Sequence, residues 1–357
     1  MTETIFSRSA LRIAVIGLGR AMINEHLPAL AADKERFDIV AACELVKERR
    51  DRIAREFPAC RMFRTFSDML DERDIDVVLI ALPAVDRLKY ALMSLERGFR
   101  TVVESPLALT AEDAKMLRGA SVKASNRLTV VERSVYSPDF TLASQVAGDS
   151  RLGNLHKVVV RREEFVRRSD WQSLQRTGGG AACCDLPDLV VPALRLIGGR
   201  PVQMWSDMKR IVSTGDVEDY VHLDILSSNS ATAEVEYNGA VLDENVSPSY
   251  TLVGSRGVFR VMPGERSGTL VHIDPSFRLP RVRTSLRTPP IESRRAKIPA
   301  VAETVSLGDD VVCGLGAFWN SVFEAVRRAV PLRHTLDESI EAVRFIQLVR
   351  KSSQFGR

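Results

Sequence analysis

The segment Arg12-Ile13-Ala14-Val15-Ile16-Gly17-Leu18-Gly19-Arg20 is an apolar run that ends in two glycines. Such a run is typical of a buried parallel strand, and a helix is expected to follow from about Ala21. Gly17 and Gly19 allow the backbone to turn sharply and to approach a pyrophosphate, which the N–H groups at a helix start can bind. Met22 stands where the dinucleotide-binding fingerprint has its third glycine, so the helix and the strand pack farther apart or the turn differs. Taken alone, the motif does not exclude an ordinary strand-to-helix turn.

A second apolar run, residues 37–43, is followed directly by Glu44, 22 residues after Met22 (44 − 22). This spacing matches the acidic residue that bonds a ribose 2′-hydroxyl in dinucleotide-binding folds. A carboxylate there repels the 2′-phosphate of NADP and favours NAD, while the nearby Lys47, Arg49 and Arg50 weaken the preference. The sequence therefore predicts NAD as the cofactor and leaves NADP open. The alternative is a solvated charge at a strand end.

A third unit has strand-like residues 75–83, helical spacing over 88–97 and strand-like residues 99–104. Strands that alternate with helices indicate a doubly wound parallel sheet of the Rossmann type. We expect this dinucleotide-binding domain to cover residues 1–130.

The second half of the chain has the pattern of an open, mostly antiparallel sheet flanked by helices. Several candidate strands alternate apolar and polar positions, namely residues 155–162, 202–211, 221–226, 232–237 and 250–261. Residues 315–330 and 336–355 have helical spacing and are expected to brace the junction between the domains. The fold class is therefore α/β plus α+β, with residues 131–357 forming a domain for substrate binding and oligomerisation.

Five stretches in this order resemble the glucose-fructose oxidoreductase, inositol dehydrogenase and MocA family (Gfo/Idh/MocA). They are His26-Leu27-Pro28-Ala29-Leu30, Ala81-Leu82-Pro83, Glu104-Ser105-Pro106-Leu107-Ala108-Leu109-Thr110, Asp170-Trp171-Gln172 and Gly178-Gly179-Gly180. The resemblance implies hydride transfer between the nicotinamide and an alcohol carbon of a sugar, inositol or related substrate. It also implies a homo-oligomer that associates through the exposed face of the C-terminal sheet.

The resemblance implies an altered catalytic site. The family has Glu-Lys-Pro where this chain has Glu104-Ser105-Pro106, and its lysine helps to polarise the substrate hydroxyl. Ser105 can donate a hydrogen bond but carries no positive charge to stabilise an alkoxide.

Two further positions depart from the family pattern. The family histidine falls eight residues after the third glycine, which is Asp188 here, and the residue four earlier is Cys184. A shift of one residue would place Leu189 and Asp185 there instead, and we prefer the first alignment because it leaves a titratable acid/base. Asp188 would be a weak base unless burial raised its pKa. Either aspartate could instead cap the helix that the following apolar run predicts.

The candidate residues fall into two groups. The catalytic candidates are Asp188, Ser105 and Cys184, although adjacent Cys183 and Cys184 are also typical of small residues in a core. The residues expected to bind the cofactor are Gly17, Gly19, Arg20, Met22, Glu44, Pro83 and Glu104.

Three classes of function follow. The first is an NAD(P)-dependent oxidoreductase that acts on a sugar, polyol or related alcohol. The second retains NAD but catalyses another reaction, as an epimerase, lyase or glycosidase. The third is a noncatalytic nucleotide-binding sensor or accessory subunit, because fold alone does not fix function.

Composition argues against a nucleic-acid partner, and we expect a small-molecule substrate. The net charge of the 357 residues is +4 and aromatic residues make up 6%, without the basic stripe expected of a nucleic-acid binder. The arginine- and proline-rich residues 278–299 are typical of an exposed arm or subunit contact. Five cysteines without Cys-x-x-Cys spacing predict neither a disulfide framework nor a metal site. No apolar run is long enough for a membrane span, and residues 1–9 lack a signal-peptide core, so we expect a cytoplasmic protein.

Overall fold

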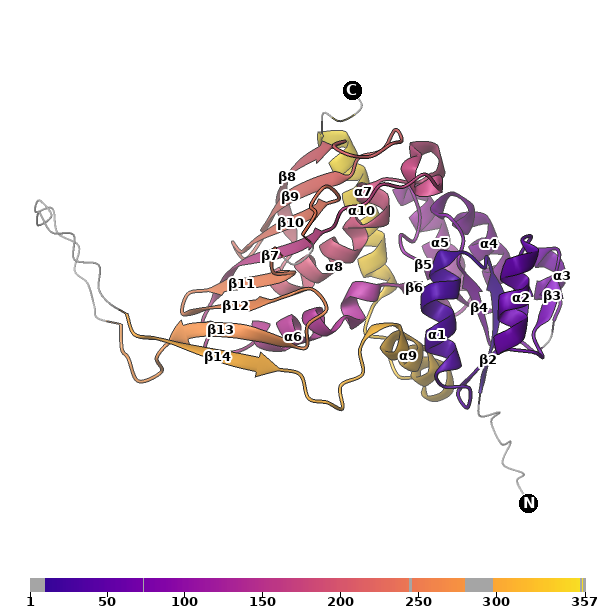
Figure 1. The fold of residues 1–357 in the computed structure, drawn as a ribbon, viewed down its shortest axis with the longest axis horizontal. Coiled ribbons are helices and arrows are strands. Elements are labelled where there is room, and N and C mark those ends of the chain that lie inside the picture. The colour runs from indigo at the N-terminus through magenta and orange to yellow at the C-terminus, as the bar shows by residue number, and fades with distance from the viewer. Residues whose placement is uncertain (1–9, 73, 244–245, 280–297, 354, 356–357) are drawn as a thin grey trace, which may run out of the picture.

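The chain folds around two β-sheets that lie side by side and are connected by helices (Figure 1). The structure, a computed structural model, describes residues 10–72, 74–243, 246–279, 298–353 and 355. Most of the predicted arginine- and proline-rich arm, residues 280–297, lies outside the described residues.

The first sheet is parallel throughout and has the strand order β3-β2-β1-β4-β5-β6. This order is that of a dinucleotide-binding Rossmann fold, so the predicted fold class is confirmed. Its topological switch point lies between β1 and β4, where ligands of such sheets bind at the carboxyl ends of the strands. The strands are β1 (Leu11–Ile16), β2 (Phe37–Cys43), β3 (Arg61–Phe63), β4 (Val77–Ile80), β5 (Arg100–Glu104) and β6 (Leu128–Val131).

The turn after β1 requires glycine at its first position. Gly17 has a φ of +88°, and a Cβ there would lie 2.6 Å from the carbonyl oxygen of Ala81 at the end of β4. The chain then enters a π-helical turn, Met22–His26, instead of an ordinary α-helix. This turn accommodates Met22 at the position of the third glycine. The helical segments around this sheet are η1 (Met22–His26), α1 (Leu27–Ala31), α2 (Lys47–Glu56), α3 (Phe66–Leu70), α4 (Ala84–Glu96) and α5 (Ala111–Lys123).

The second sheet has eight strands in the order β14-β13-β12-β11-β7-β10-β9-β8. All neighbours pair antiparallel except β7 and β10, so the predicted mostly antiparallel sheet is confirmed. The strands are β7 (Leu155–Glu163), β8 (Pro201–Lys209), β9 (Tyr220–Ser227), β10 (Thr232–Asn238), β11 (Tyr250–Gly254), β12 (Gly257–Val261), β13 (Ser267–Ile273) and β14 (Ala300–Ser306).

Two of these strands, β13 and β14, were not predicted from the sequence. The β14 strand is at the edge of the sheet and carries Glu303, Thr304 and Ser306, so its pattern resembles that of a polar loop.

Helices cover one face of the second sheet, while its other face has no helix packed on it among the described residues (Figure 1). The α6 helix (Pro138–Ala147) packs on β11 to β13, and α8 (Leu186–Ile197) packs on β7 and β10. Shorter helical turns are η2 (Arg133–Tyr136), η3 (Trp171–Ser173), η4 (Gln175–Thr177) and α7 (Ala181–Cys184). No helix in the described part of the chain has both the length and the apolar character needed to cross a membrane.

The last two helices contact both sheets. The α10 helix (Leu336–Ser352) packs against α5 and β6 of the first sheet and also against α8 and β8 of the second. The α9 helix (Gly314–Arg328) returns to α1 and to η2. These contacts are those expected of helices that brace the junction.

A buried tryptophan shows how α9 completes the core of the first sheet. Trp319 is fully buried, and its ring meets the rings of His26, Phe37 and Phe318 edge-on, with centroids 5.4 to 6.1 Å apart. Its indole Nε1 donates a hydrogen bond to His26 Nδ1 at 3.1 Å. The core around β2 therefore depends on a residue from the far end of the chain.

We expect Trp319→Ala to lower the free energy of unfolding by about 3 to 5 kcal/mol, because it leaves a large cavity and a buried His26 Nδ1 without its partner. Urea denaturation followed by circular dichroism measures this. Phe165→Ala is the matched control, since that large side chain is 43% exposed. Equal losses in the two variants would contradict the role assigned to Trp319.

Candidate active site

A cleft of about 540 Å³ runs between the carboxyl ends of the first sheet's strands and the start of α8. Its volume is within the range of small-molecule and cofactor sites. The two halves of the chain both contribute to its lining. Nine of the predicted site residues line it, namely Gly17, Gly19, Arg20, Glu44, Pro83, Glu104, Ser105, Cys184 and Asp188.

Met22 is the exception among the predicted cofactor-binding residues. Its side chain is fully buried in the hydrophobic core and does not line the cleft. The π-helical turn directs it inward, so the position of the third fingerprint glycine has a packing role here.

The cofactor end of the cleft is formed by the glycine turn and by Glu44. A Cβ at Gly19 would meet no atom within 4 Å, so space for a ligand adjoins the backbone there. The Glu44 carboxylate follows β2 and accepts hydrogen bonds from the N–H groups of Leu18, Leu45 and Val46, each at 2.8 Å. Burial alone would raise the pKa of Glu44, but these backbone donors, together with Arg49, lower it. The group is therefore ionised, and these residues fit a nicotinamide dinucleotide with its ribose at Glu44.

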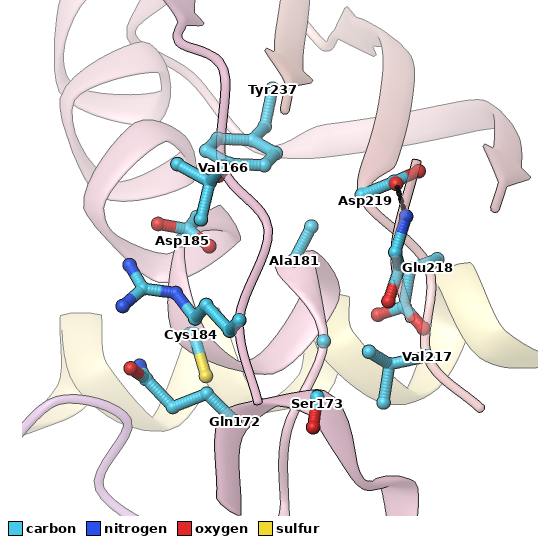
Figure 2. A pocket seen from close by; sticks show the side chains of 13 residues that line it. Val166, Gln172, Ser173, Ala181, Cys184, Asp185, Val217, Glu218, Asp219 and Tyr237 are labelled. Atoms are coloured by element: carbon cyan, nitrogen blue, oxygen red, sulfur yellow. Dashed lines mark hydrogen bonds between the residues drawn. The ribbon is translucent and has the colours of Figure 1, made fainter. Parts of the chain in front are cut away.

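A smaller side pocket opens beside the cleft and shares Arg168, Gln172, Cys184 and Asp185 with it. Figure 2 shows Asp185, Cys184 and Gln172 on one side of this pocket, and Glu218 and Asp219 on the other. Its volume is about 40 Å³, which suits one or two water molecules rather than a sugar. The larger cleft is therefore the candidate active site.

Glu104 is the centre of a buried polar network behind the cleft. Its Oε1 accepts from Arg133 Nη2 at 2.7 Å and lies 2.7 Å from His26 Nε2. Burial alone would raise the pKa of this carboxyl, but Arg133 and His26 outweigh burial and hold it well below its usual range. The Glu104 carboxylate therefore anchors neighbouring elements at the edge of the cleft.

The backbone of this strand end is also held by Arg87. Its guanidinium Nη1 donates to the carbonyl oxygens of Glu104 and Pro106, at 3.0 and 2.7 Å, and Nε donates to Leu82 at 2.8 Å. Burial lowers the pKa of Arg87 to about 10, so it remains charged at neutral pH. The residue between the two carbonyls, Ser105, is thereby held in a fixed position at the cleft.

Two aspartates enter the cleft from the start of α8. Asp188 lines it, whereas Leu189 packs in the hydrophobic core, so the geometry favours the alignment that gives Asp188 the acid/base position. Arg162 from β7 lies between the two carboxylates, 3.7 Å from Asp188 Oδ2 and 3.6 Å from Asp185 Oδ1. Asp185 is the N-terminal boundary residue of α8, but its side chain makes no capping hydrogen bond, so capping does not explain it.

Burial changes the acidity of both groups. It raises the pKa of Asp185 to about 7, although Arg162 partly opposes this. It also raises the pKa of Asp188, against the opposing charges of Arg162 and Arg133. The Asp188 Oδ1 atom is buried and has no hydrogen-bond partner in the described part of the chain. A carboxylate that has an unpaired oxygen and is more basic than an ordinary aspartate is suited to accept a proton.

Cys184 is less suited to catalysis. Burial, followed by the charge of Asp185, raises the pKa of its thiol far above the usual value, and its Sγ lies 3.8 Å from the carbonyl oxygen of Gly178. The thiolate is therefore not populated at neutral pH, and Cys184 contributes to the lining of the cleft as a neutral side chain.

Comparison with known proteins identifies the fold and the cofactor class. Residues 11–132 match the family described as "Oxidoreductase family, NAD-binding Rossmann fold", Gfo/Idh/MocA. Over these residues the chain matches the Gfo/Idh/MocA family, as the sequence predicted. It is an oxidoreductase with a nicotinamide dinucleotide cofactor, so the predicted family, enzyme class and cofactor are confirmed.

Individual relatives are distant but cover nearly the whole chain. A scyllo-inositol 2-dehydrogenase (NADP(+)) from Bacillus subtilis is 20% identical over 97% of this chain and 95% of its own. The aldose-aldose oxidoreductase from Caulobacter crescentus, solved with glycerol, has 18% identity and a TM-score of 0.78, with 98% of each chain covered. The WlbA dehydrogenase from Bordetella pertussis, solved with NADH and UDP-GlcNAcA, has 17% identity and a TM-score of 0.75, again over 98% of each chain.

The structure adds site residues that the sequence did not single out, notably Glu132, Arg133 and Arg162. Glu132 and Arg133 directly follow β6, and the rule that ligands bind at the carboxyl ends of parallel strands would have found them. Nothing in the sequence marks Arg162, which is one charged residue among several on β7.

Arg133 provides a positive charge near the position of Ser105, where the Gfo/Idh/MocA family has a lysine. It lines the same cleft, and its side chain is 29% exposed. Burial alone would lower its pKa, but Glu104 and Asp188 raise it above the usual value, so the guanidinium stays charged. Arg133 thus supplies a permanent positive charge to a site whose family lysine is absent.

We expect Glu44→Gln to reduce the preference for NAD over NADP by roughly tenfold, because the change removes the negative charge opposite a 2′-phosphate. Calorimetric titration of the variant with both oxidised nucleotides gives the ratio of dissociation constants. Glu48→Gln, on the exposed surface of α2, is the control and should leave that ratio unchanged. An unaltered ratio in Glu44→Gln would show that Glu44 does not face the 2′ position.

Proposed function

We propose that this enzyme oxidises a secondary alcohol of a sugar or polyol and transfers the hydride to NAD(P)⁺. The observation that supports this most directly is Asp188, a buried carboxylate in the cleft with one oxygen free of hydrogen bonds in the described residues. The names of relatives support the same substrate class, since they include an inositol dehydrogenase and an aldose-aldose oxidoreductase.

The glycine turn and Glu44 hold the cofactor, and its nicotinamide, when bound, supplies the acceptor for the hydride. Asp188 accepts the proton of the substrate hydroxyl, because burial makes it a stronger base than an ordinary aspartate. Ser105 orients the same hydroxyl from the opposite strand end. Arg133 and Arg162 supply the positive charge that stabilises the developing alkoxide.

The rest of the cleft suits a molecule rich in hydroxyl groups. Hydrogen-bonding side chains from both halves of the chain face it, and Arg20 Nη2 donates to Gln172 Oε1 at 2.8 Å across the boundary. This hydrogen bond joins the two halves of the chain at the cleft. Further polar lining residues are Arg168 and Asp170.

The first experiment is a search for NADH or NADPH formation, by absorbance, with inositols, aldoses and linear polyols as substrates. We expect one of these classes to support turnover, and Asp188→Asn to lower kcat by about 10² to 10⁴ because it removes the proton acceptor.

Asp185→Asn is the matched control. Asp185 pairs with Arg162, as Asp188 does, but it also lines the side pocket. It should retain more kcat than Asp188→Asn. Nucleotide binding without net reduction on any alcohol would contradict the proposal and point to an internally recycled cofactor. A larger loss in Asp185→Asn than in Asp188→Asn would reassign the proton acceptor.

We also propose that the enzyme is a homo-oligomer that associates through the uncovered face of the second sheet. Apolar side chains are exposed on β8, with Val202 and Trp205 60% and 58% exposed. Trp205 stacks edge-on against His222 of the neighbouring strand β9, which holds its ring in place on this surface. Exposed aromatic side chains on a flat sheet are typical of subunit contacts.

Light scattering at micromolar concentration tests this assembly. We expect the wild type to be a multimer and Trp205→Arg to shift toward the monomer, because a buried charge would have no partner at the contact. Val85→Arg, on the exposed surface of α4, should leave the mass unchanged. A monomeric wild type would exclude the proposed assembly.

Two expectations from the sequence remain proposals. We propose that the domains are residues 1–130 and 131–357, a division supported by the end of β6 at Val131. The helices α9 and α10 lie in the second domain by sequence but pack on both sheets. We further propose a cytoplasmic location, which the free cysteines of the described residues support.

A further inference from the structure

A second cavity of about 460 Å³ adjoins the active-site cleft. Arg133 and Arg162 line both spaces, so the two meet at these guanidinium groups. The lining of the second cavity comes from residues after β6, whereas the cleft also contains the glycine turn and Glu44. The second cavity therefore adjoins the end of the cleft where Asp188 lies, 3.7 Å from Arg162, and not the cofactor end.

Arg162 occupies a core-facing position on a central strand. The β7 strand lies between β11 and β10, and α8 packs on it. Val158 and Val160 are fully buried at alternate positions of β7, and Arg162 is the next residue on the same face. Its side chain is nevertheless 37% exposed. It is exposed at this depth because the two cavities meet around it.

The guanidinium of Arg162 has donors that the protein does not use. It lies 3.6 Å from Asp185 and 3.7 Å from Asp188, beyond hydrogen-bonding distance, and no described residue accepts a hydrogen bond from its side chain. A structural arginine of this fold is bonded more closely, since Arg195 donates to both oxygens of Glu338 at 2.5 and 2.8 Å. The N–H groups of Arg162 thus remain available to a ligand.

The chemistry of the two cavities favours a ligand with one negative charge. The planar fork of a guanidinium matches a carboxylate or a phosphate. Three acidic side chains line the second cavity and oppose a doubly charged phosphate more strongly than a carboxylate. The same carboxylates and three serines suit the hydroxyl groups of a carbon chain. These six residues are Ser134, Ser137, Asp139, Glu163, Glu164 and Ser249.

We propose that Arg162 binds a carboxylate of the substrate, and that the second cavity holds the rest of its hydroxylated chain. The substrate is then a sugar acid, of the aldonic or uronic type. This inference rests on the proposed function and names its substrate class. A carboxylate on Arg162 brings a nearby hydroxyl of the same molecule to Asp188, because that aspartate adjoins the same guanidinium. A neutral sugar would leave the donors of Arg162 without a partner.

The test compares sugar acids with neutral counterparts that have a CH₂OH group in place of the carboxylate. D-Gluconate is compared with D-glucitol, and D-glucuronate with D-glucose, by calorimetric titration of the protein saturated with NADH. We expect the acid of at least one pair to bind roughly tenfold or more tightly than its neutral counterpart, because it gains charge-assisted hydrogen bonds.

Substitutions of Arg162 assign this discrimination to one side chain. Arg162→Gln should reduce the ratio of dissociation constants to about one, and Arg162→Lys, which keeps the charge without the fork, should give an intermediate ratio. Arg260→Gln is the matched control, since Arg260 is exposed on β12 of the same sheet, and it should leave the ratio unchanged. Circular dichroism and NADH binding establish that each variant is folded. If Arg162→Gln does not fold, Arg162→Lys supplies the comparison.

The role of the second cavity is tested with a shorter acid. D-Lactate has a carboxylate and a neighbouring hydroxyl but lacks the remaining carbon chain. It should bind more weakly than D-gluconate, because the hydrogen-bonding groups of the second cavity then have no partner. Equal affinities would show that the chain does not enter this cavity.

The outcomes separate this inference from the proposed function. Neutral compounds that bind as tightly as the acids, or acids that do not bind to the NADH complex, would overturn the inference and leave the oxidation of neutral alcohols open. A preference for acids that persists in Arg162→Gln would also overturn it. Acid binding that depends on Arg162, without reduction of NAD⁺ or NADP⁺ by any alcohol, would support the anion site but contradict the proposed function.

Discussion

The ion pair between the Glu104 carboxylate and Arg133 fixes the positions of the active-site elements relative to one another. Glu104 ends β5, Arg133 begins η2, and His26, the third partner, lies on the helix that follows the glycine turn. His26 in turn accepts from Trp319 of α9. Removing water from two charges is costly, and a buried pair offsets this cost only when its geometry and additional hydrogen bonds are good. Here the hydrogen bonds of the Glu104 carboxylate with Arg133 and His26 offset this cost, and they fix three strand and helix ends at the edge of one cleft.

This network also explains why a serine can occupy the position of the family lysine. A lysine at 105 would bring a second cation next to Arg133, whose charge is already committed to Glu104 and Glu25 but still faces the cleft. With Ser105, the hydroxyl can reach Glu132 behind the strand end. The positive charge and the hydrogen-bonding group, combined in one lysine in the family, are thus divided between Arg133 and Ser105.

The sequence predicted those parts of the site that depend on neighbours in the chain. The glycine turn and Glu44 follow from local backbone geometry and a fixed spacing, and both lie where expected. Asp188 was found only by alignment with a family pattern, and the burial that raises its pKa depends on packing that no local pattern encodes. Met22 was assigned to the cofactor because a fingerprint position was assumed to keep its role, whereas the π-helical turn directs its side chain into the core.

The roles of residues that depend on long-range contacts could not be predicted from local sequence patterns. Glu132 owes its character to Asp188, Ser339 and Ser105, which come from three other segments of the chain. In isolation it is one glutamate at a strand end, with an ordinary pKa and no distinguishing neighbour in sequence. What distinguishes it in the fold is complete burial, and α10 packs against β6, the strand that Glu132 follows. The helix that braces the two sheets therefore also lies against the strand end that carries this buried carboxyl.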